Sequence, residues 1–202
     1  MVIALLQQPF WFLRHGETAA NAADIIAGST DSPLTRRGHA QAHQAARLLK
    51  DQPLAAIWTS PLSRARLTAQ AVAQATGAPL VTLPGLAERD WGTWEGQPRH
   101  VLRRDATPPE GEGPETFRHR IREALGAIVG PFPVLIVAHS GTARELHALL
   151  CPDPIGQPFQ RPGNAVPLVW RPGPDGHWSF AELSPDCQRP SLGQPHLHPR
   201  SF

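Results

Sequence analysis

The stretch that decides the fold is Phe10-Trp11-Phe12-Leu13-Arg14-His15-Gly16-Glu17-Thr18, in which a short apolar run ends at an arginine, a histidine and a glycine. Apolar runs of this length bounded by glycine are typical of buried strands. In an open α/β sheet, ligands bind at the carboxyl ends of such strands. Arg14 offers a planar set of donors that matches phosphate oxygens, and a neutral His15 can attack phosphorus. The stretch therefore predicts a strand that carries a phosphate-binding and nucleophilic pair, although such a pair can also lie on a surface without any chemistry.

The composition places the chain among ordinary globular proteins. Its 202 residues, of which 41% are hydrophobic, are enough for one domain with a sizeable core. The formal net charge of +2 is too small to indicate nucleic-acid binding, and it is compatible with a small anionic substrate. Cys151 and Cys187 are too few for a disulfide framework or a zinc site, so we expect free thiols in a reducing compartment.

No segment approaches the length of a membrane span, and residues 2–6 lack the basic region that precedes the apolar core of a signal peptide. We therefore expect a cytoplasmic protein that binds neither nucleic acid nor a membrane, and the sequence leaves its oligomeric state open. His39 and His43 are spaced for one helix face, but without a third ligand nearby we expect a solvated surface and no metal site.

Strand-like and helix-like segments alternate along the chain. The expected strands cover residues 10–13, 55–59, 80–83 and 133–138, and the expected helices cover residues 35–50, 60–76, 115–129 and 142–150. This alternation predicts a three-layer α/β sandwich, with a mostly parallel central sheet and helices on both of its faces. Residues 166–170 and 178–183 are predicted to form a hairpin at the sheet edge. We expect one domain over residues 1–184 and a tail rich in Pro and His over residues 185–202, while residues 2–6 could be an edge strand or an irregular start.

Three residues mark the ends of two of these helices. Thr35 is expected to cap the first long helix at its N-terminus. Ser60 is expected to cap the next one, with Pro61 at its first helical position, and Gly77 is expected to end it. This placement puts Arg64 in the first turn, where free backbone N–H groups already favour anions.

Further polar residues follow the other strands. His139-Ser140-Gly141 stands between a strand and a helix, as Arg14-His15-Gly16 follows the first strand, and Glu88 comes shortly after another strand. A cationic pocket with two imidazoles and one carboxylate has the groups that phosphoryl transfer through a phosphohistidine needs.

These residues resemble the motifs of the histidine phosphatase superfamily, whose members have the phosphoglycerate-mutase-like fold. The resemblance follows the family's order from Phe10 to about Leu183. It is carried by Leu13-Arg14-His15-Gly16-Glu17-Thr18 with Asn21, Asp31-Ser32-Pro33-Leu34-Thr35, Ser60-Pro61-Leu62 with Arg64 and Thr68-Ala69, Glu88 with Gly92 and Trp94-Glu95-Gly96, Val137-Ala138-His139-Ser140-Gly141, and Asn164-Ala165.

The resemblance implies a phosphomonoesterase that uses no metal and no cofactor and acts on a small phosphorylated metabolite. It implies that His15 is the nucleophile and that Glu88 protonates the leaving group and later activates water. The groups implied to hold the phosphoryl group are Arg14, Asn21, Arg64, His139 and Ser140. An acid at neutral pH would need a raised pKa, which burial or a neighbouring carboxylate, Asp90 or Glu95, could give to Glu88.

Two departures from the family pattern concern the substrate. Ile25 and Ala27 stand where many relatives carry an arginine and a glutamine, which predicts a less polar rim. The stretch from Glu95 to Glu115 is shorter than the insertions that cover the site in true mutases, so we expect a pocket open to water. A phosphatase is therefore favoured, and the alternatives are a phosphoglycerate mutase and a non-catalytic phosphate-binding module on the same fold.

Overall fold

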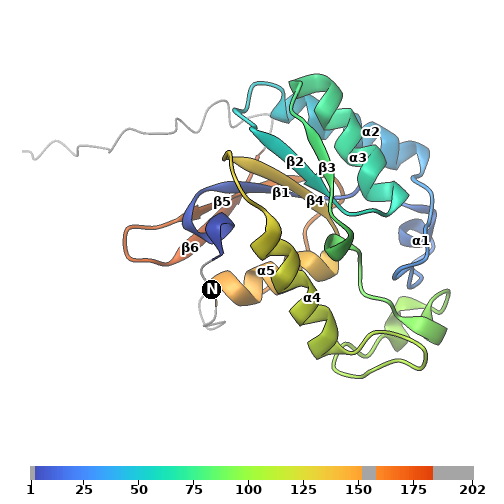
Figure 1. Ribbon diagram of the computed structural model, residues 1–202. Helices are drawn as coiled ribbons and strands as arrows, with labels where there is room; N and C mark the ends of the chain where they lie inside the picture. The colour runs from blue at the N-terminus through green and yellow to red at the C-terminus, as the bar shows by residue number, and fades with distance from the viewer. Residues whose placement is uncertain (1–2, 152–157, 184–202) are drawn as a thin grey trace, which may run out of the picture.

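The computed structural model describes residues 3–151 and 158–183 (Figure 1). Its strands are β1 (Phe10–Arg14), β2 (Ala56–Thr59), β3 (Leu80–Thr82), β4 (Val134–Ala138), β5 (Pro167–Pro172) and β6 (Trp178–Glu182). Its helices are α1 (Ala19–Ala22), α2 (Arg36–Leu49), α3 (Ser63–Thr76), α4 (Pro114–Ala127) and α5 (Ser140–Leu150), with 3-10 turns η1 (Ala4–Gln7), η2 (Pro84–Leu86), η3 (Gly92–Trp94) and η4 (Arg99–Val101).

The six strands form one sheet in the order β3-β2-β4-β1-β5-β6. The pairs from β3 to β1 are parallel, and β5 and β6 add an antiparallel hairpin at one edge. The predicted mostly parallel sheet and its terminal hairpin are therefore confirmed. Parallel neighbours end at the same edge of a sheet, so the carboxyl ends of β1, β2 and β4 lie together.

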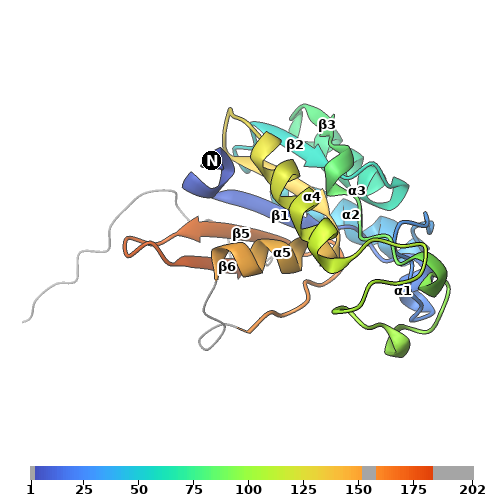
Figure 2. The same ribbon diagram turned by 60° about the horizontal axis from the view of Figure 1, so that its bottom comes forward.

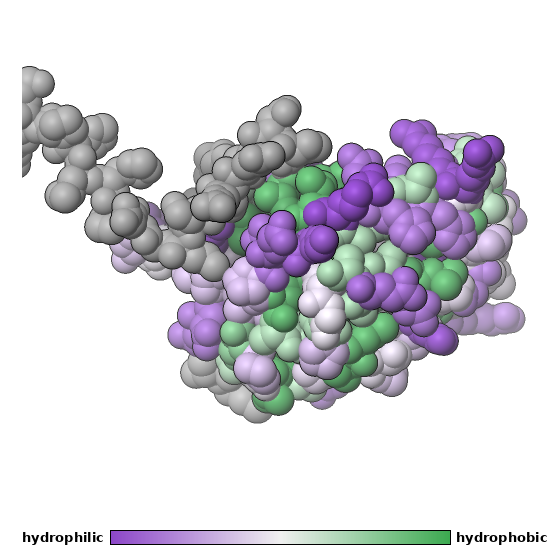
Figure 3. All heavy atoms as spheres, turned by 90° about the horizontal axis from the view of Figure 1, so that it is seen from above, coloured by the Kyte–Doolittle hydropathy of each residue, from purple (hydrophilic) through white to green (hydrophobic). Residues whose placement is uncertain are grey.

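Helices cover both faces of the sheet because the central strands are apolar on both sides. In β1, Phe10 and Phe12 belong to a core cluster that contains residues of α4 and α5. Trp11 and Leu13 belong to a second cluster, which contains residues of α2 and α3. All five residues of β1 are buried, as expected for a strand covered on both faces. Figure 3 views the molecule from the side on which α2 and α3 lie, where hydrophilic side chains are interspersed with smaller hydrophobic patches.

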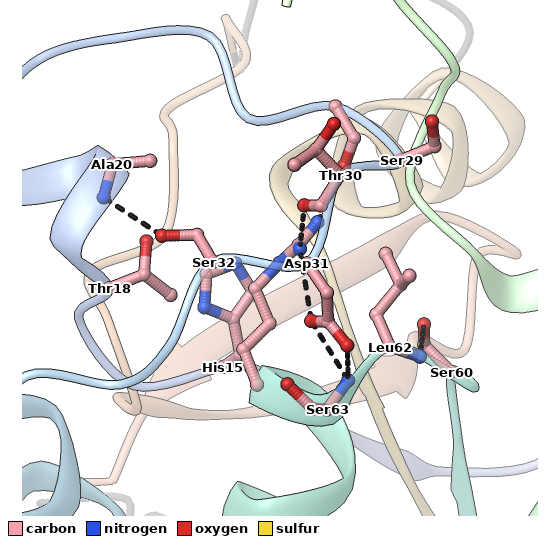
Figure 4. A network of polar contacts seen from close by, with 12 residues as sticks. His15, Thr18, Ala20, Ser29, Thr30, Asp31, Ser32, Ser60, Leu62 and Ser63 are labelled. Carbon is pink, nitrogen blue, oxygen red and sulfur yellow. Dashed lines mark hydrogen bonds and ion pairs between the residues drawn. The ribbon is translucent and has the colours of Figure 1, made fainter. Parts of the chain in front are cut away.

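Two expected ends of helices are confirmed and one is wrong. The hydroxyl of Thr35 accepts a hydrogen bond from Gly38 N–H at the start of α2, and Gly77 ends α3 with a φ of 74°. The helix after β2, however, begins at Ser63 and not at Pro61, so Ser60 is not its cap. The carboxylate of Asp31 accepts from Ser63 N–H instead, at 2.9 Å, as Figure 4 shows.

At the N-terminus, residues 4–7 form a 3-10 turn and not an edge strand. The predicted tail over residues 185–202 lies outside the described residues. In the described part of the chain, no helix has both the length and the hydrophobicity that a membrane crossing requires.

Candidate active site

The pairing of β1 with β4 brings the two predicted histidines together. Arg14 lies opposite Ala138 in this register, and the next backbone N–H, that of His15, donates to Ala138 O at 3.1 Å. The residue after Ala138 is His139, at the N-terminus of α5. The two imidazole rings are consequently 5.2 Å apart between centroids, at an angle of 57°.

His15 is fixed in one tautomer by its own backbone. Its Nδ1 lies 2.7 Å from Gly16 O, which can only accept, so Nδ1 carries the proton and Nε2 keeps its lone pair. Burial, followed by the positive charges of Arg64 and Arg14, lowers the pKa of His15 well below 6.5. The ring is therefore neutral at pH 7 and available as a nucleophile.

His139 is held by a serine. Its Nε2 lies 2.7 Å from Ser60 Oγ, and this oxygen also accepts from Leu62 N–H at 3.3 Å, as Figure 4 shows for the second bond. A hydroxyl that accepts from Leu62 N–H can still donate its one proton to Nε2, and we assign this arrangement, which places the ring proton of His139 on Nδ1. This Nδ1 is buried and has no hydrogen-bond partner. Burial, then Arg64 and His15, lowers the pKa of His139 well below 6.5.

Arg14 leaves one buried donor unused. Its guanidinium donates to Pro162 O at 3.0 Å and to Asn21 Oδ1 at 3.4 Å, whereas its Nε–H is buried and has no partner. Burial, then the charges of Arg161 and Arg99, lowers the pKa of Arg14 to about 9, so the group stays protonated at pH 7. Buried polar groups are almost always hydrogen-bonded, and an anion at this point would satisfy both Arg14 Nε–H and His139 Nδ1–H.

Arg64 is the largest fully buried side chain of the core, with 1% of its surface exposed. It donates to Gly28 O at 2.6 Å and to Thr30 O at 2.8 Å, so two of its five N–H groups are used by one loop. Burial lowers the pKa of Arg64, and the negative charges of Glu88 and Asp31 offset part of this decrease. Its remaining donors give the pocket a second fixed guanidinium.

The loop that holds Arg64 is itself held by Glu95. The carboxylate of Glu95 accepts from the backbone N–H and hydroxyl groups of both Ser29 and Thr30, and from Trp91 N–H at 3.0 Å. Burial opposes the charged form, but these hydrogen bonds, led by the one from the Thr30 side chain, lower the pKa of Glu95. Glu95 thus positions the carbonyl groups that orient Arg64.

Glu88 lies beside the start of α5. Its Oε2 accepts from Gly141 N–H at 3.0 Å and from the hydroxyl of Ser140 at 3.4 Å, and its Oε1 accepts from Arg89 N–H at 2.9 Å. The carboxylate neighbours predicted for Glu88 bond elsewhere, since Glu95 holds residues 29–30 and 91, and Asp90 accepts from Gly92 N–H. Backbone N–H groups and a hydroxyl, not a second carboxylate, therefore surround this acid.

The structure brings the predicted site residues together around one cavity of about 440 Å³. Six of the seven line it, and His139 lies directly behind His15; the six are Arg14, His15, Asn21, Arg64, Glu88 and Ser140. This cavity lies beyond the carboxyl ends of β1 and β4, where Figure 2 shows α1 and the segment between β3 and α4 side by side. Ile26 and Ala27 give part of its wall an apolar lining.

Several supporting residues were not assigned any role from the sequence. Asn164 donates to His15 O at 2.9 Å and to Asn21 Oδ1 at 3.1 Å, and Thr68 accepts from Gly16 N–H at 3.0 Å. Asn164 and Thr68 belong to motifs that the sequence shares with the family. The sequence does not predict that they contact the backbone of residues 15–16. Within residues 3–151 and 158–183, no three His, Cys, Asp or Glu side chains are grouped to hold a metal ion.

A family model, related protein sequences and solved structures all indicate the same family. The model of the histidine phosphatase superfamily (branch 1) matches residues 10–180. The adenosylcobalamin/alpha-ribazole phosphatase of Salmonella typhimurium is 34% identical over 161 residues, which cover 71% of this chain and 80% of that protein. A Yersinia enterocolitica protein named "Probable phosphoglycerate mutase GpmB" is 35% identical over 144 residues, which cover 62% of this chain and 67% of that protein.

A solved structure extends the likeness to three dimensions. The mycobacterial glucosyl-3-phosphoglycerate phosphatase, solved with VO3, superimposes with a TM-score of 0.70 at 26% identity, over 86% of this chain and 97% of that chain. The family model covers most of the chain. The chain belongs to the histidine phosphatase superfamily, branch 1.

Proposed function

We propose that this protein hydrolyses phosphomonoesters of small metabolites, with His15 as the nucleophile. The observation that carries the proposal is the state of the His15 ring, whose Nδ1–H is bound to Gly16 O and whose Nε2 is free beside two buried guanidiniums. Such a neutral imidazole in a cationic pocket can attack a phosphorus atom whose oxygens are held by fixed positive groups.

In the first step, His15 Nε2 attacks the phosphorus in line with the leaving oxygen. The N–P bond forms as the P–O bond to the substrate breaks, and a protonated Glu88 gives its proton to the leaving oxygen. Arg14 Nε–H, His139 Nδ1–H and the free donors of Arg64 bind the phosphoryl oxygens. These donors are already in place before the reaction, so little reorganisation accompanies the change in charge.

In the second step, water replaces the imidazole. Glu88, now ionised, takes a proton from the water, the new O–P bond forms, the N–P bond breaks, and phosphate and neutral His15 are regenerated. The proton lost in the first step is thereby recovered, and no group besides those of the pocket is needed.

A phosphoenzyme test separates this chemistry from simple phosphate binding. Rapid quenching with ³²P-labelled p-nitrophenyl phosphate should give a label that is lost in acid, survives in base, and maps to the peptide containing His15. The His15→Ala variant should take no label. A wild-type protein that takes no label and releases no phosphate from several phosphomonoesters would contradict the proposal and support a non-catalytic phosphate-binding module.

A phosphoglycerate mutase is the second candidate, because one of the relatives carries that name. The two enzymes differ in what accepts the phosphoryl group from His15, water or the substrate itself. With 3-phosphoglycerate, we expect free phosphate in proportion to the substrate consumed. Isomerised phosphoglycerate without free phosphate would instead identify a mutase.

A further inference from the structure

The mouth of the cavity carries arginines that the reaction at His15 does not use. Four of them, which we call the outer arginines, line the cavity: Arg99, Arg104, Arg144 and Arg161. They come from four separate parts of the chain, namely η4, the segment after it, α5 and the segment before β5. Their convergence on one opening is therefore a product of the fold and not of a local run of basic residues.

The charge of the cavity exceeds what one phosphoryl group can balance. Eight arginines and four carboxylates line it, which leaves an excess of four positive charges. A phosphomonoester contributes about two negative charges at neutral pH. About two of the four excess positive charges therefore remain unbalanced after the reacting phosphoryl group has bound. We assign these remaining charges to the outer arginines.

Most of the outer arginines lack a protein partner for their charge. The guanidinium groups of Arg104 and Arg161 make no hydrogen bond or ion pair with any residue of the described ranges 3–151 and 158–183. The guanidinium of Arg144 lies 4.2 Å from the centre of the Phe159 ring, a stacking contact that leaves its edge free for an anion. Partial desolvation, followed by the charges of neighbouring arginines, lowers the pKa of both Arg144 and Arg161, although both residues remain in contact with solvent.

Three of the four carboxylates nearby are already engaged or belong to the reaction. Glu115 and Glu145 pair with Arg118 at 2.6 and 3.3 Å, and Glu88 is held at the start of α5. Asp105, next to Arg104 in the chain, also lines the cavity and is one of the four carboxylates already counted. The positive charge of the mouth thus has no full counterpart within the described protein.

The segment that carries Arg104 is held in place by a buried residue. Arg89, which is 4% exposed, donates to the carbonyl oxygens of Arg104 and Ala106 at 2.7 Å each and to Glu112 O at 2.8 Å. Because this backbone is already fixed, binding of an anion by Arg104 costs the entropy of the side chain but not that of ordering the segment. The backbone at this part of the cavity mouth is therefore already in position before an anion binds.

We propose that the substrate carries a second anionic group, a carboxylate or a phosphate, and that Arg104, Arg144 and Arg161 bind this group while the reacting phosphoryl group lies at His15. This inference rests on the proposed function. The cavity of about 440 Å³ is large enough for a small metabolite that reaches both ends. Leu102 and Phe117, which line the cavity as well, provide apolar contacts for the carbon atoms between the two anions.

Two matched substrate pairs test the second anion. 3-Phosphoglycerate and glycerol 3-phosphate share a three-carbon skeleton and differ in a carboxylate against a hydroxymethyl group. Propane-1,3-diol bisphosphate and its monophosphate differ in a second phosphate. In at least one pair, we expect the doubly anionic substrate to have a kcat/KM about 10- to 100-fold higher, beyond the twofold statistical factor of the bisphosphate. This advantage should shrink as salt is added.

Substitutions of single arginines test which residues cause the preference for the doubly anionic substrate. Arg104→Gln and Arg161→Gln should each lower the ratio of the two kcat/KM values about tenfold, because each removes a charge-assisted contact to the second anion. Arg103→Gln is the matched control, since Arg103 is the exposed neighbour of Arg104 and does not line the cavity. A change of the ratio in Arg103→Gln as large as in Arg104→Gln would contradict the inference.

The outcomes separate this inference from the proposed function. Equal kcat/KM values within both pairs, once the twofold statistical factor of the bisphosphate is removed, would overturn the second-anion site and leave the phosphatase intact. Absence of phosphate release from all four substrates, together with absence of the phosphoenzyme label, would overturn the proposed function itself.

Discussion

The inner site, by which we mean the residues around His15 that would hold the phosphoryl group, and the outer arginines both contain guanidinium groups, but these groups differ in burial and in hydrogen bonding. Arg14 and Arg64 are 4% and 1% exposed, are attached to the end of β1 and the first turn of α3, and donate to carbonyl groups. Arg104 and Arg161 are exposed, lie outside helices and strands, and have no such donors engaged within the described residues. From this difference we infer that the sheet positions the reacting groups, whereas the segments around its edge determine which substrates bind.

This division predicts two kinds of mutational effect. Loss of an inner group removes an interaction with the reacting phosphorus and should lower kcat for every substrate. Loss of an outer group should change the ranking of substrates. The experiments below test how sharply the two regions separate.

The largest effect is expected for His15→Ala. Loss of the nucleophile removes the covalent route, so kcat should fall by about 10⁴-fold or more with every phosphomonoester. Steady-state phosphate release with p-nitrophenyl phosphate measures it. His119→Ala is the control, because this histidine is 75% exposed on α4 and should keep wild-type turnover. Retention of a tenth of the activity in His15→Ala would remove the inner site from the reaction.

A smaller and more selective loss is expected for Glu88→Gln, which keeps the size of the side chain and removes its ionisable proton. Formation of the phosphoenzyme from an alkyl phosphate should slow about 10²- to 10⁴-fold, because an alkoxide needs a proton as it leaves. p-Nitrophenolate leaves without one, so phosphoenzyme formation from its phosphate ester, measured as the rate of the p-nitrophenolate burst, should slow by less than about tenfold. Glu123→Gln, at an exposed position of α4, should change neither rate. Equal losses in this first step with both substrates would show that Glu88 is not the acid.

The inner site could be predicted from the sequence because its residues stand at the ends of recognisable strands. The apolar runs before Arg14 and His139 fix two parallel strands, and parallel pairing then brings the following histidines to one edge. The fold class and the terminal hairpin follow from the same alternation of patterns. In this part of the molecule, the place that the sequence pattern predicts for a residue is the place that the structure gives it.

Prediction from the sequence failed where a local motif meets a distant partner. Ser60-Pro61 has the form of a helix start, but the hydroxyl of Ser60 bonds to His139, and Asp31 from another loop accepts from the N–H of Ser63. Glu95 similarly holds residues 29–30, and was expected beside Glu88. Arg104 and Arg161 lie in segments without periodicity, so no pattern could show that they share one opening with Arg99 and Arg144.

An intermediate effect is expected for Ser60→Ala. The hydroxyl donates to the neutral ring of His139 and so favours it; its loss should raise the pKa of that ring from its lowered value. The kcat/KM should fall about tenfold, since Nδ1–H is no longer the fixed donor. A positive charge on His139, whose ring lies 5.2 Å from that of His15, would withdraw electron density from the attack of His15, so the acid limb of the pH profile should shift to higher pH relative to the wild type with the same substrate.

Two features of this experiment isolate the hydrogen bond to His139. Comparison on one substrate cancels the ionisation of the substrate itself. Ser63→Ala is the matched control, since Ser63 uses only its backbone N–H to bond Asp31 and should leave the pH profile unchanged. A Ser60→Ala protein with wild-type kcat/KM and an unshifted acid limb would mean that the tautomer of His139 is set by another group.

The smallest effect is expected at the one outer arginine that has a carboxylate partner. Arg99 pairs with Asp24 at 3.2 Å, and Asp24 is 78% exposed, so solvent weakens the pair. Asp24 has a φ of 51°, which asparagine also tolerates, so Asp24→Asn removes the charge without straining the backbone. Freed from this pair, Arg99 should raise kcat/KM for a doubly anionic substrate about twofold at low salt, with no change for its singly anionic match. An equal gain for both substrates would mean that Arg99 acts on the reacting phosphoryl group, and the boundary between the two regions would then lie farther out than the outer arginines.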